Sequence, residues 1–366
     1  MNMIYLLLIL FPAFISMMFI PYWTRRTESF GVTIPEGVYS NSNIKKLRKQ
    51  YVLWTALASI LVTALFLVLG SSEGIDESTY AFIFSALIFL YLIGTFFIYL
   101  FFHRVMKRLK KTEQWGKEKA QQVFISTEFR KEKLNHSNLW FGISFLITIA
   151  IIALTFVLYD RIPEKIPMQY NFDGEITNWA TKSPKSLLLM PIMSLYLTLL
   201  FMFLNTMIAK AKQQISAERP KESLQQNIIF RRRWSAYLIS TGIGLALLFA
   251  FIQLSFIFNM NQQLMTIIPL VFAGIITIWA IILSITTGQG GSRVKVSTGS
   301  NGEVIDRDDD KHWKLGVFYF NPNDPAIFLE KRFGVGWTIN LGKPVAWLIF
   351  LGIILLAIGI PYLLGM

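Results

Sequence analysis

Eight apolar stretches, each followed by a more polar segment, divide the chain. They are Met3–Ile20, Tyr51–Leu69, Tyr80–Phe102, Leu139–Tyr159, Leu187–Ile208, Trp234–Ile257, Met265–Leu283 and Pro344–Leu364. A helix of about 20 apolar residues, rising about 1.5 Å per residue, crosses the roughly 30 Å hydrocarbon core of a bilayer. The pattern therefore predicts an all-α polytopic membrane protein with eight transmembrane helices. The first stretch lacks a basic leader and a small-residue cleavage site, so we expect an uncleaved span.

The composition agrees with this prediction. Of the 366 residues, 54% are hydrophobic and 16% are charged, whereas soluble domains carry about 25% charged residues. The chain has no cysteine, which excludes disulfides, thiolate metal sites and a cysteine nucleophile. His103, His136 and His312 do not form a metal-binding motif. With no acid/base pair or Ser–His–Asp pattern either, we expect no enzyme, no cofactor and no metal site.

The distribution of Lys and Arg predicts the orientation. The segments after the first, third, fifth and seventh spans hold 31 of the 35 basic residues, and the others hold 4. Since basic loops remain in the cytoplasm, both termini are expected outside. The net charge of +13 then reflects topology, and we expect no nucleic-acid partner.

The predicted spans contain no Asp, Glu, Lys or Arg. Ionisable groups inside the membrane are costly and usually functional. Their absence disfavours proton-coupled transporters, voltage sensors and intramembrane metalloproteases, but leaves open a passive path lined by hydroxyls or carbonyls. The most polar residues in the spans, Asn205 and Gln253, are expected to form hydrogen bonds between helices.

The outward loop Asp160–Ser186 has the composition of an ordered loop. The dipeptides Ile162-Pro163 and Ile166-Pro167 favour an extended backbone, and the run Asn171–Gly174 is a strong turn signal. The loop is either a rigid connector between spans four and five or an outward recognition surface. The candidate ligand-binding residues are Pro163, Pro167, Gln169, Asn171, Asp173, Gly174, Trp179 and Lys182.

The same loop resembles a known family. Its sequence IPEKIPMQYNFDGEITNWATK is similar to the bacterial pattern IPxxIPxHxNxxGxxxxWxxK of the domain of unknown function sixteen-forty-eight. That module occurs in SdpI-type immunity proteins, multi-span proteins that protect their producer from a secreted peptide toxin and relay its presence to a repressor. Gln169 stands where the family commonly has histidine, and the glycine-tyrosine-arginine-threonine signature of the second SdpI half is absent. The resemblance implies a multi-pass protein of the bacterial cell membrane.

The polar segment 286–343 resembles a second module, the domain of unknown function fifty-eight-oh-eight, for which no activity is implied. Trp313–Phe320 and Ala326–Arg332 predict two strands that pair as a β-hairpin across an Asn/Pro turn. Gly288–Gly291 is expected to be a hinge. Asp306, Asp308 and Asp310 are spaced as in a calcium loop, but Lys311 replaces the required glycine. We therefore expect a solvated acidic run.

Five parts follow from these boundaries. They are three spans in 1–138, a two-span module in 139–208, two spans in 209–285, a cytoplasmic module in 286–343 and the last span in 344–366. Part of the third loop, Lys107–Phe129, is expected to form an amphipathic helix on the membrane surface.

Two function classes remain open. The first is a non-catalytic protein of sensing or immunity type, which recognises a peptide, protein or envelope component through loop 160–186. Its basic inner face and the 286–343 segment would engage a cytoplasmic protein partner or anionic lipid. The second is a transporter or channel subunit, or an accessory subunit of a membrane complex.

Overall fold

Eight α-helices, each running opposite to the one before it in the chain, form most of the part of the molecule that the structure describes. The structure, a computed structural model, describes residues 3–70, 77–115, 121–122, 132–171, 174–258, 260–296, 305–306 and 308–363. The helices are α1 (Met3–Trp23), α2 (Ser42–Gly70), α3 (Glu77–Thr112), α4 (Gly142–Val157), α5 (Pro184–Lys210), α6 (Pro220–Ile257), α7 (Gln262–Thr287) and α8 (Pro344–Leu363). Seven are long and apolar enough to cross a membrane, and α1 adds a shorter apolar stretch over Leu10–Trp23. The prediction of an all-α multi-pass membrane protein is confirmed.

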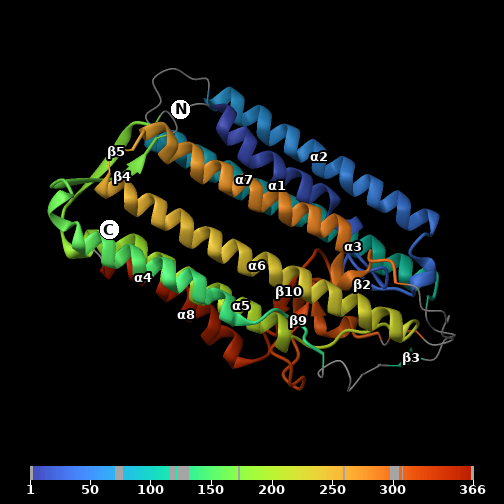
Figure 1. The fold of residues 1–366 in the computed structure, drawn as a ribbon. Coiled ribbons are helices and arrows are strands. Elements are labelled where there is room, and N and C mark those ends of the chain that lie inside the picture. The colour runs from blue at the N-terminus through green and yellow to red at the C-terminus, as the bar shows by residue number, and fades with distance from the viewer. Residues whose placement is uncertain are drawn as a thin grey trace.

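The helices pack in two groups (Figure 1). One group consists of α1, α2 and α3, whose buried contact includes Phe14, Val62, Phe66 and Tyr91. The other consists of α4, α5 and α6, with α8 beside α5. Helix α7 contacts both α1 and α6 and so joins the two groups. Both the start of α1 and the end of α8 lie at the same end of the bundle.

Buried polar side chains join α4, α5 and α6. Gln253 Nε2 on α6 donates to Thr155 Oγ1 on α4 at 3.2 Å and to the Leu187 carbonyl on α5 at 3.0 Å. Near the opposite end of the bundle, Ser235 Oγ on α6 donates to Asn205 Oδ1 on α5 at 2.6 Å. The predicted interhelical roles of Asn205 and Gln253 are confirmed.

The described strands form two-stranded sheets, which lie at the two ends of the helix bundle. They are β1 (Glu28–Ser29) with β2 (Val32–Thr33), β3 (Gln121–Gln122) with β6 (Ile305–Asp306), β4 (Lys165–Tyr170) with β5 (Ile176–Thr181), β7 (Trp313–Lys314) with β8 (Phe318–Tyr319), and β9 (Phe328–Glu330) with β10 (Trp337–Ile339). All are antiparallel except β3 with β6. The β4–β5 hairpin lies across one end of the bundle, with the start of α1 and the end of α8 (Figure 1).

At the other end, four segments pack together, and we call them the basal assembly: 24–41, 211–219, 288–296 and 308–343. The β1–β2 turn anchors it to the helices. Phe30 at that turn is fully buried, and its ring lies 5.5 Å from that of Phe102 and 6.0 Å from that of Phe333. The Phe30 carbonyl lies 2.8 Å from Nδ1 of His103 on α3. The stacking of Phe30 with Phe102 and Phe333 therefore brings the N-terminal and C-terminal parts of the assembly together against α3.

The predicted pairing of Trp313–Phe320 with Ala326–Arg332 is wrong. The first segment folds on itself, because Leu315 (φ 53°) and Gly316 (φ 74°) form a turn in the left-handed region. The second segment pairs instead with β10, in the register Leu329 opposite Thr338. Two small hairpins therefore precede α8, in place of one.

The segment Gly288–Gly291, predicted to be a hinge, is closely packed in the structure. Gln289 is fully buried, and its side chain accepts from the Gly336 amide at 2.7 Å and donates to the Gly336 carbonyl at 2.9 Å. Gly291 packs against the backbone of Gln226 on α6. The segment is a tightly packed joint.

Three helices, α2, α3 and α6, extend past the predicted spans by nine residues or more. Helix α2 starts nine residues before Tyr51, α6 starts at Pro220, and α3 continues to Thr112. The predicted surface helix Lys107–Phe129 thus begins as the end of α3. Residues 121–122 form the strand β3 and not a helix, and residues 116–120 and 123–129 of the predicted helix lie outside the described residues.

Candidate functional site

The base of the β4–β5 hairpin is fixed to the helix bundle by two isoleucines. Ile162 and Ile166 are 2% and 0% exposed, and they pack with Leu187 on α5 and with Phe256 on α6. The prolines that follow them favour the extended backbone that this packing needs. The predicted extended segment is confirmed, and it carries its apolar side chains toward the bundle.

The tip of the hairpin rests on the start of α7. Asn171 Oδ1 accepts from the Glu175 amide at 2.7 Å, and the Gly174 amide donates to the Asn171 carbonyl at 3.1 Å. Gly174 has φ 88°, as the turn requires. Thr266 Oγ1 on α7 donates to the same Asn171 carbonyl at 3.2 Å. Asp173, the remaining candidate in this turn, lies outside the described residues.

Lys182 closes the hairpin at its base. Its Nζ donates to the Ile162 carbonyl at 2.9 Å and lies 4.4 Å from the centre of the Tyr159 ring. The Lys182 amide donates to the Glu164 carbonyl at 2.8 Å. These contacts give Lys182, like Asn171 and Gly174, a part in shaping the hairpin.

The open face of the hairpin carries the remaining candidates. Trp179 is 51% exposed and lies opposite Pro167 in the β4–β5 register. Because side chains alternate along a strand, this pair lies on the face away from Ile166. Pro163 and Gln169 are also exposed. The predicted ligand-binding residues therefore differ in role. Asn171, Gly174 and Lys182 maintain the shape of the hairpin, whereas the exposed ones are Pro163, Gln169 and Trp179.

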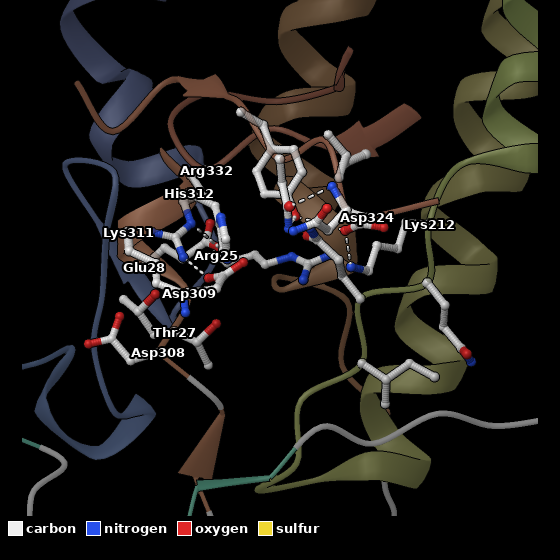
Figure 2. Close-up of a pocket in the computed structure, with 18 of the residues that line it drawn as sticks. Arg25, Thr27, Glu28, Lys212, Asp308, Asp309, Lys311, His312, Asp324 and Arg332 are labelled. Atoms are coloured by element: carbon white, nitrogen blue, oxygen red, sulfur yellow. Dashed lines mark hydrogen bonds and ion pairs between the residues drawn. The ribbon is translucent and has the colours of Figure 1, made fainter. Parts of the chain in front are cut away.

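A polar cavity of about 430 Å³ lies within the basal assembly. Figure 2 shows Arg332 and Asp309 on one side of it and Lys212 and Asp324 on the other. Its charged lining residues are Arg25, Glu28, Lys212, Asp308, Asp309, Lys311, Asp324 and Arg332. In the part of the chain that the structure describes, no group of three or more His, Cys, Asp and Glu side chains is arranged to hold a metal ion.

Glu330 on β9 connects the basal assembly to three helices. Its fully buried carboxylate pairs with Arg25 after α1, accepts from Asn227 Nδ2 on α6 at 2.7 Å and lies 3.3 Å from Arg231. Arg231 in turn donates to the carbonyls of Ile208, Ala211 and Lys212 at the end of α5. A helix C-terminus leaves such carbonyls without helical partners and attracts positive charge. The Glu330 cluster therefore fixes α1, α5 and α6 to one strand.

Asp308 and Asp310 of the acidic run pair with basic side chains, which the prediction of a solvated run did not include, although the Asp308 side chain remains 37% exposed. The buried guanidinium of Arg332 pairs with Asp309 and Asp310. Lys110 Nζ on α3 lies 2.6 Å from Asp308 and 2.8 Å from Asp310. Burial alone would raise the pKa of Asp310, but Arg332 and Lys110 hold that pKa at about 2. Asp306 contributes to β6, and its side chain is not among those described.

Glu28 is a buried carboxyl beside this cluster. It is 8% exposed, and its Oε1 lies 3.9 Å from Arg332 Nε. Its Oε2 has no hydrogen-bond partner among the described residues. Burial raises the pKa of Glu28 to about 8, although Arg332 and Arg25 oppose the shift. The carboxyl is therefore protonated near neutral pH.

A pH-dependent stability follows from Glu28. Its pKa is 4.5 without the shift and about 8 in the folded protein. Between these values folding binds a proton, so Glu28 makes stability fall as pH rises from about 4.5 to 8. Glu28→Gln mimics the protonated form. We expect the melting temperature of the detergent-purified variant to match wild type near pH 4.5 and to exceed it by on the order of 5 °C at pH 9.

The control for this prediction is Glu164→Gln, because the Glu164 side chain is 84% exposed. Its melting temperature is expected to follow that of the wild type at every pH. A difference between Glu28→Gln and wild type that stays constant from pH 5 to 9 would contradict the assigned role of Glu28.

Sequence reasoning missed the residues of the basal assembly. Arg231 was interpreted only as one of the basic loop residues, and Glu28 received no role. One local signal was present: Glu330 and Arg332 stand two residues apart in the predicted strand Ala326–Arg332, and side chains two residues apart on a strand lie on the same face. Their partners, however, come from distant parts of the sequence.

The geometry defines a multi-pass membrane protein with an ordered hairpin at one end and a charged, strand-containing assembly at the other. Two family models match the chain, and each match includes residues at one of these two ends. Residues 146–195 match the Domain of unknown function (DUF1648), and residues 322–347 match the Family of unknown function (DUF5808). The first match includes the β4–β5 hairpin, and the second includes Glu330 and Arg332. Both predicted resemblances are confirmed. No curated protein and no solved structure matches the chain.

Proposed function

We propose that this chain is a non-catalytic sensing or immunity protein of the bacterial cell membrane. In this proposal the hairpin faces outward and the basal assembly faces the cytoplasm. The orientation is supported by the distribution of charge, because the segments that follow the first, third, fifth and seventh spans in the sequence hold 31 of the 35 basic residues. The DUF1648 match supports the comparison with SdpI-type immunity proteins.

The observation that carries the proposal is the construction of the hairpin. Ile162 and Ile166 fix its base, and Thr266 fixes its tip. The opposite face presents an indole, Trp179, with half of its surface exposed. A rigid support under an exposed aromatic side chain suits recognition of a peptide or an envelope component, because little conformational entropy is lost on binding.

Polar contacts recur at several points along the α4–α6 unit between the hairpin and the basal assembly. Gln253 binds the backbone at the start of α5, just after the hairpin. Asn205 and Ser235 join α5 to α6 further along, and Arg231 and Glu330 connect both helices to β9. In the proposal, ligand binding at the hairpin shifts this α4–α6 unit, and a cytoplasmic protein partner or anionic lipid at the basic face responds.

The orientation is tested with single cysteines, since the chain has none of its own. Thr177 on β5 and Asn323 in the basal assembly are both exposed. In intact cells we expect a membrane-impermeant maleimide to label Thr177→Cys at once and Asn323→Cys only after permeabilisation. The reverse pattern would place the hairpin in the cytoplasm and overturn the proposal.

The recognition role is tested with Trp179→Ala, which changes the open face and leaves the buried contacts intact. We expect this variant to reach the membrane at the wild-type level and to lose at least tenfold in survival when a deletion strain is grown in conditioned medium of its parent. Trp140→Ala is the control, because Trp140 is 56% exposed at the other end of the bundle. If Trp179→Ala protects as well as the wild type, the hairpin is only a connector. Solute flux through liposomes that contain only the purified chain would favour the transporter class.

A further inference from the structure

The first turns of α2 and the last turns of α3 form a basic surface, which we call the α2–α3 edge. Its segments 42–50 and 103–112 lie past the apolar runs of the two helices and contain no Asp or Glu. Seven of its basic side chains are exposed: Lys45, Lys46, Lys49, Arg104, Lys107, Arg108 and Lys111. Among the described residues none of these seven pairs with a carboxylate, whereas the less exposed Lys110 pairs with Asp308 and Asp310.

The start of α2 holds more positive charge than its own helix favours. A helix N-terminus is the positive end of the helix dipole and stabilises acidic residues, yet the first turn of α2 has none. Arg48 on the next turn is 3% exposed, and its Nη1 donates to the Tyr39 carbonyl at 3.2 Å. Its Nε and Nη2 have no hydrogen-bond partner among the described residues. These groups are too deeply buried to contact a ligand, but the charge of Arg48 adds to the positive potential at the surface of α2.

Two stacked aromatic rings adjoin the exposed cations. Trp54 on α2 and Phe101 on α3 have ring centroids 5.9 Å apart and planes 13° apart, and each side chain is 52% exposed. Residues three or four apart share a helix face, so Arg104 and Arg108 continue the face of Phe101, and Lys46 lies about two turns before Trp54. Tryptophan is enriched at the headgroup level of a membrane. Along this surface, an apolar region is therefore followed by an aromatic pair and then by cations.

We propose that the α2–α3 edge binds an anionic phospholipid. The phosphate lies at Lys46, Arg104 and Arg108, and an acyl chain lies along Trp54 and Phe101. The cations supply the attraction for a negative headgroup, since no carboxylate of the two segments offsets them. The exposed rings and the apolar runs below them favour a lipid over a free phosphate or an acidic protein. The inference rests on the proposed function in one respect: it names the anionic lipid as what the basic face binds.

The test measures binding to the purified full chain in a nonionic detergent, by fluorescence anisotropy of phospholipids labelled at the end of one acyl chain. We expect phosphatidylglycerol to bind at least about tenfold more tightly than phosphatidylcholine, because each nearby basic residue attracts an anionic headgroup. The preference is expected to shrink as salt is added. Equal binding of the two lipids would overturn the proposal.

The source of the phosphate is tested by competition. Unlabelled phosphatidylglycerol should displace the labelled lipid, whereas glycerol 3-phosphate should not, because it has no acyl chain to lie along the two rings. Displacement by glycerol 3-phosphate would show a site for free phosphate and overturn the assignment to a lipid.

Variants locate the site. The triple variant Lys46→Gln, Arg104→Gln and Arg108→Gln is expected to reduce the preference for phosphatidylglycerol to about twofold or less. Its melting temperature should remain that of the wild type, because exposed side chains away from buried contacts contribute little to stability. Trp54→Ala is expected to weaken both lipids by the same factor and so to leave the preference unchanged. Wild-type binding of both lipids to Trp54→Ala would overturn the placement of the acyl chain.

A second triple variant controls for net charge. It removes three exposed lysines from other segments, namely Lys133→Gln, Lys221→Gln and Lys314→Gln. We expect it to keep the preference of the wild type. An equal loss in both triple variants would show attraction by total charge alone and overturn the α2–α3 site. Because lipid binding in detergent does not depend on the orientation or on the hairpin, failure of these tests leaves the recognition role of Trp179 to be decided by its own experiment.

Discussion

Replacing Glu330 with glutamine is expected to destabilise the protein by about 3–5 kcal/mol, the usual cost of removing one partner from a buried ion pair. The Glu330 side chain is fully buried, and it offsets the charges of Arg25 and Arg231. Glutamine keeps the shape and the hydrogen bond to Asn227, but it leaves two arginines without this carboxylate. Arg231 is itself fully buried, so water cannot replace the lost interaction.

The matched control for Glu330→Gln is Glu132→Gln. Glu132 also pairs with an arginine of α6, Arg232, at 3.2 Å, but both side chains are about half exposed. An exposed pair contributes only about 0–1 kcal/mol. Thermal unfolding of the two purified variants measures the difference, and we expect a drop of about 6–15 °C for Glu330→Gln against 2 °C or less for Glu132→Gln. Equal shifts would show that Glu330 is not the ionic centre of the basal assembly.

Most of the fold was predictable because its signal is local. An apolar run such as Leu187–Ile208 can satisfy its backbone in a bilayer only as a helix, so length and composition suffice. The extended first strand and the turn of the β4–β5 hairpin were predictable for the same reason, since Ile166-Pro167 and Gly174 constrain their own backbone. The second strand and its pairing were not predicted. The ends of the helices were less predictable. Helix α6 begins at Pro220, well before the apolar run that starts at Trp234, because its polar first turns pack on the basal assembly instead of lipid.

The basal assembly was not predictable from local patterns. Glu330 meets Arg25 across 305 positions of sequence and Arg231 across 99, and no spacing rule connects them. The basic run Arg231–Arg233 next to a span is normally interpreted as a topology signal. Nothing in the run itself indicates that Arg231 is buried. A count of charges in loops also treats every charged residue as exposed to solvent. That assumption is wrong for Arg332, which is buried and pairs with Asp309 and Asp310.

The Gly291→Ala substitution is expected to be the second most damaging change. Gly291 has φ 81°, which costs an alanine about 1–2 kcal/mol. A Cβ at this position would also lie 2.5 Å from the Gln226 carbonyl carbon on α6 and closer still to its oxygen. Backbone cannot move aside as a flexible side chain can, so either the joint or α6 must shift, at a further cost of about 1–3 kcal/mol.

Gly336→Ala separates the two contributions in Gly291→Ala. Gly336 has φ 111°, but a Cβ there would meet no atom within 4 Å. It therefore carries the backbone strain alone, and we expect about half the loss in melting temperature or less. Because Gln289 binds the Gly336 backbone, both variants report on one joint, in which the end of α7 is fixed to α6 and to the β9–β10 hairpin. A hinge at Gly288–Gly291 would tolerate alanine at position 291 at least as well as at 336, whereas a packed joint requires the opposite order.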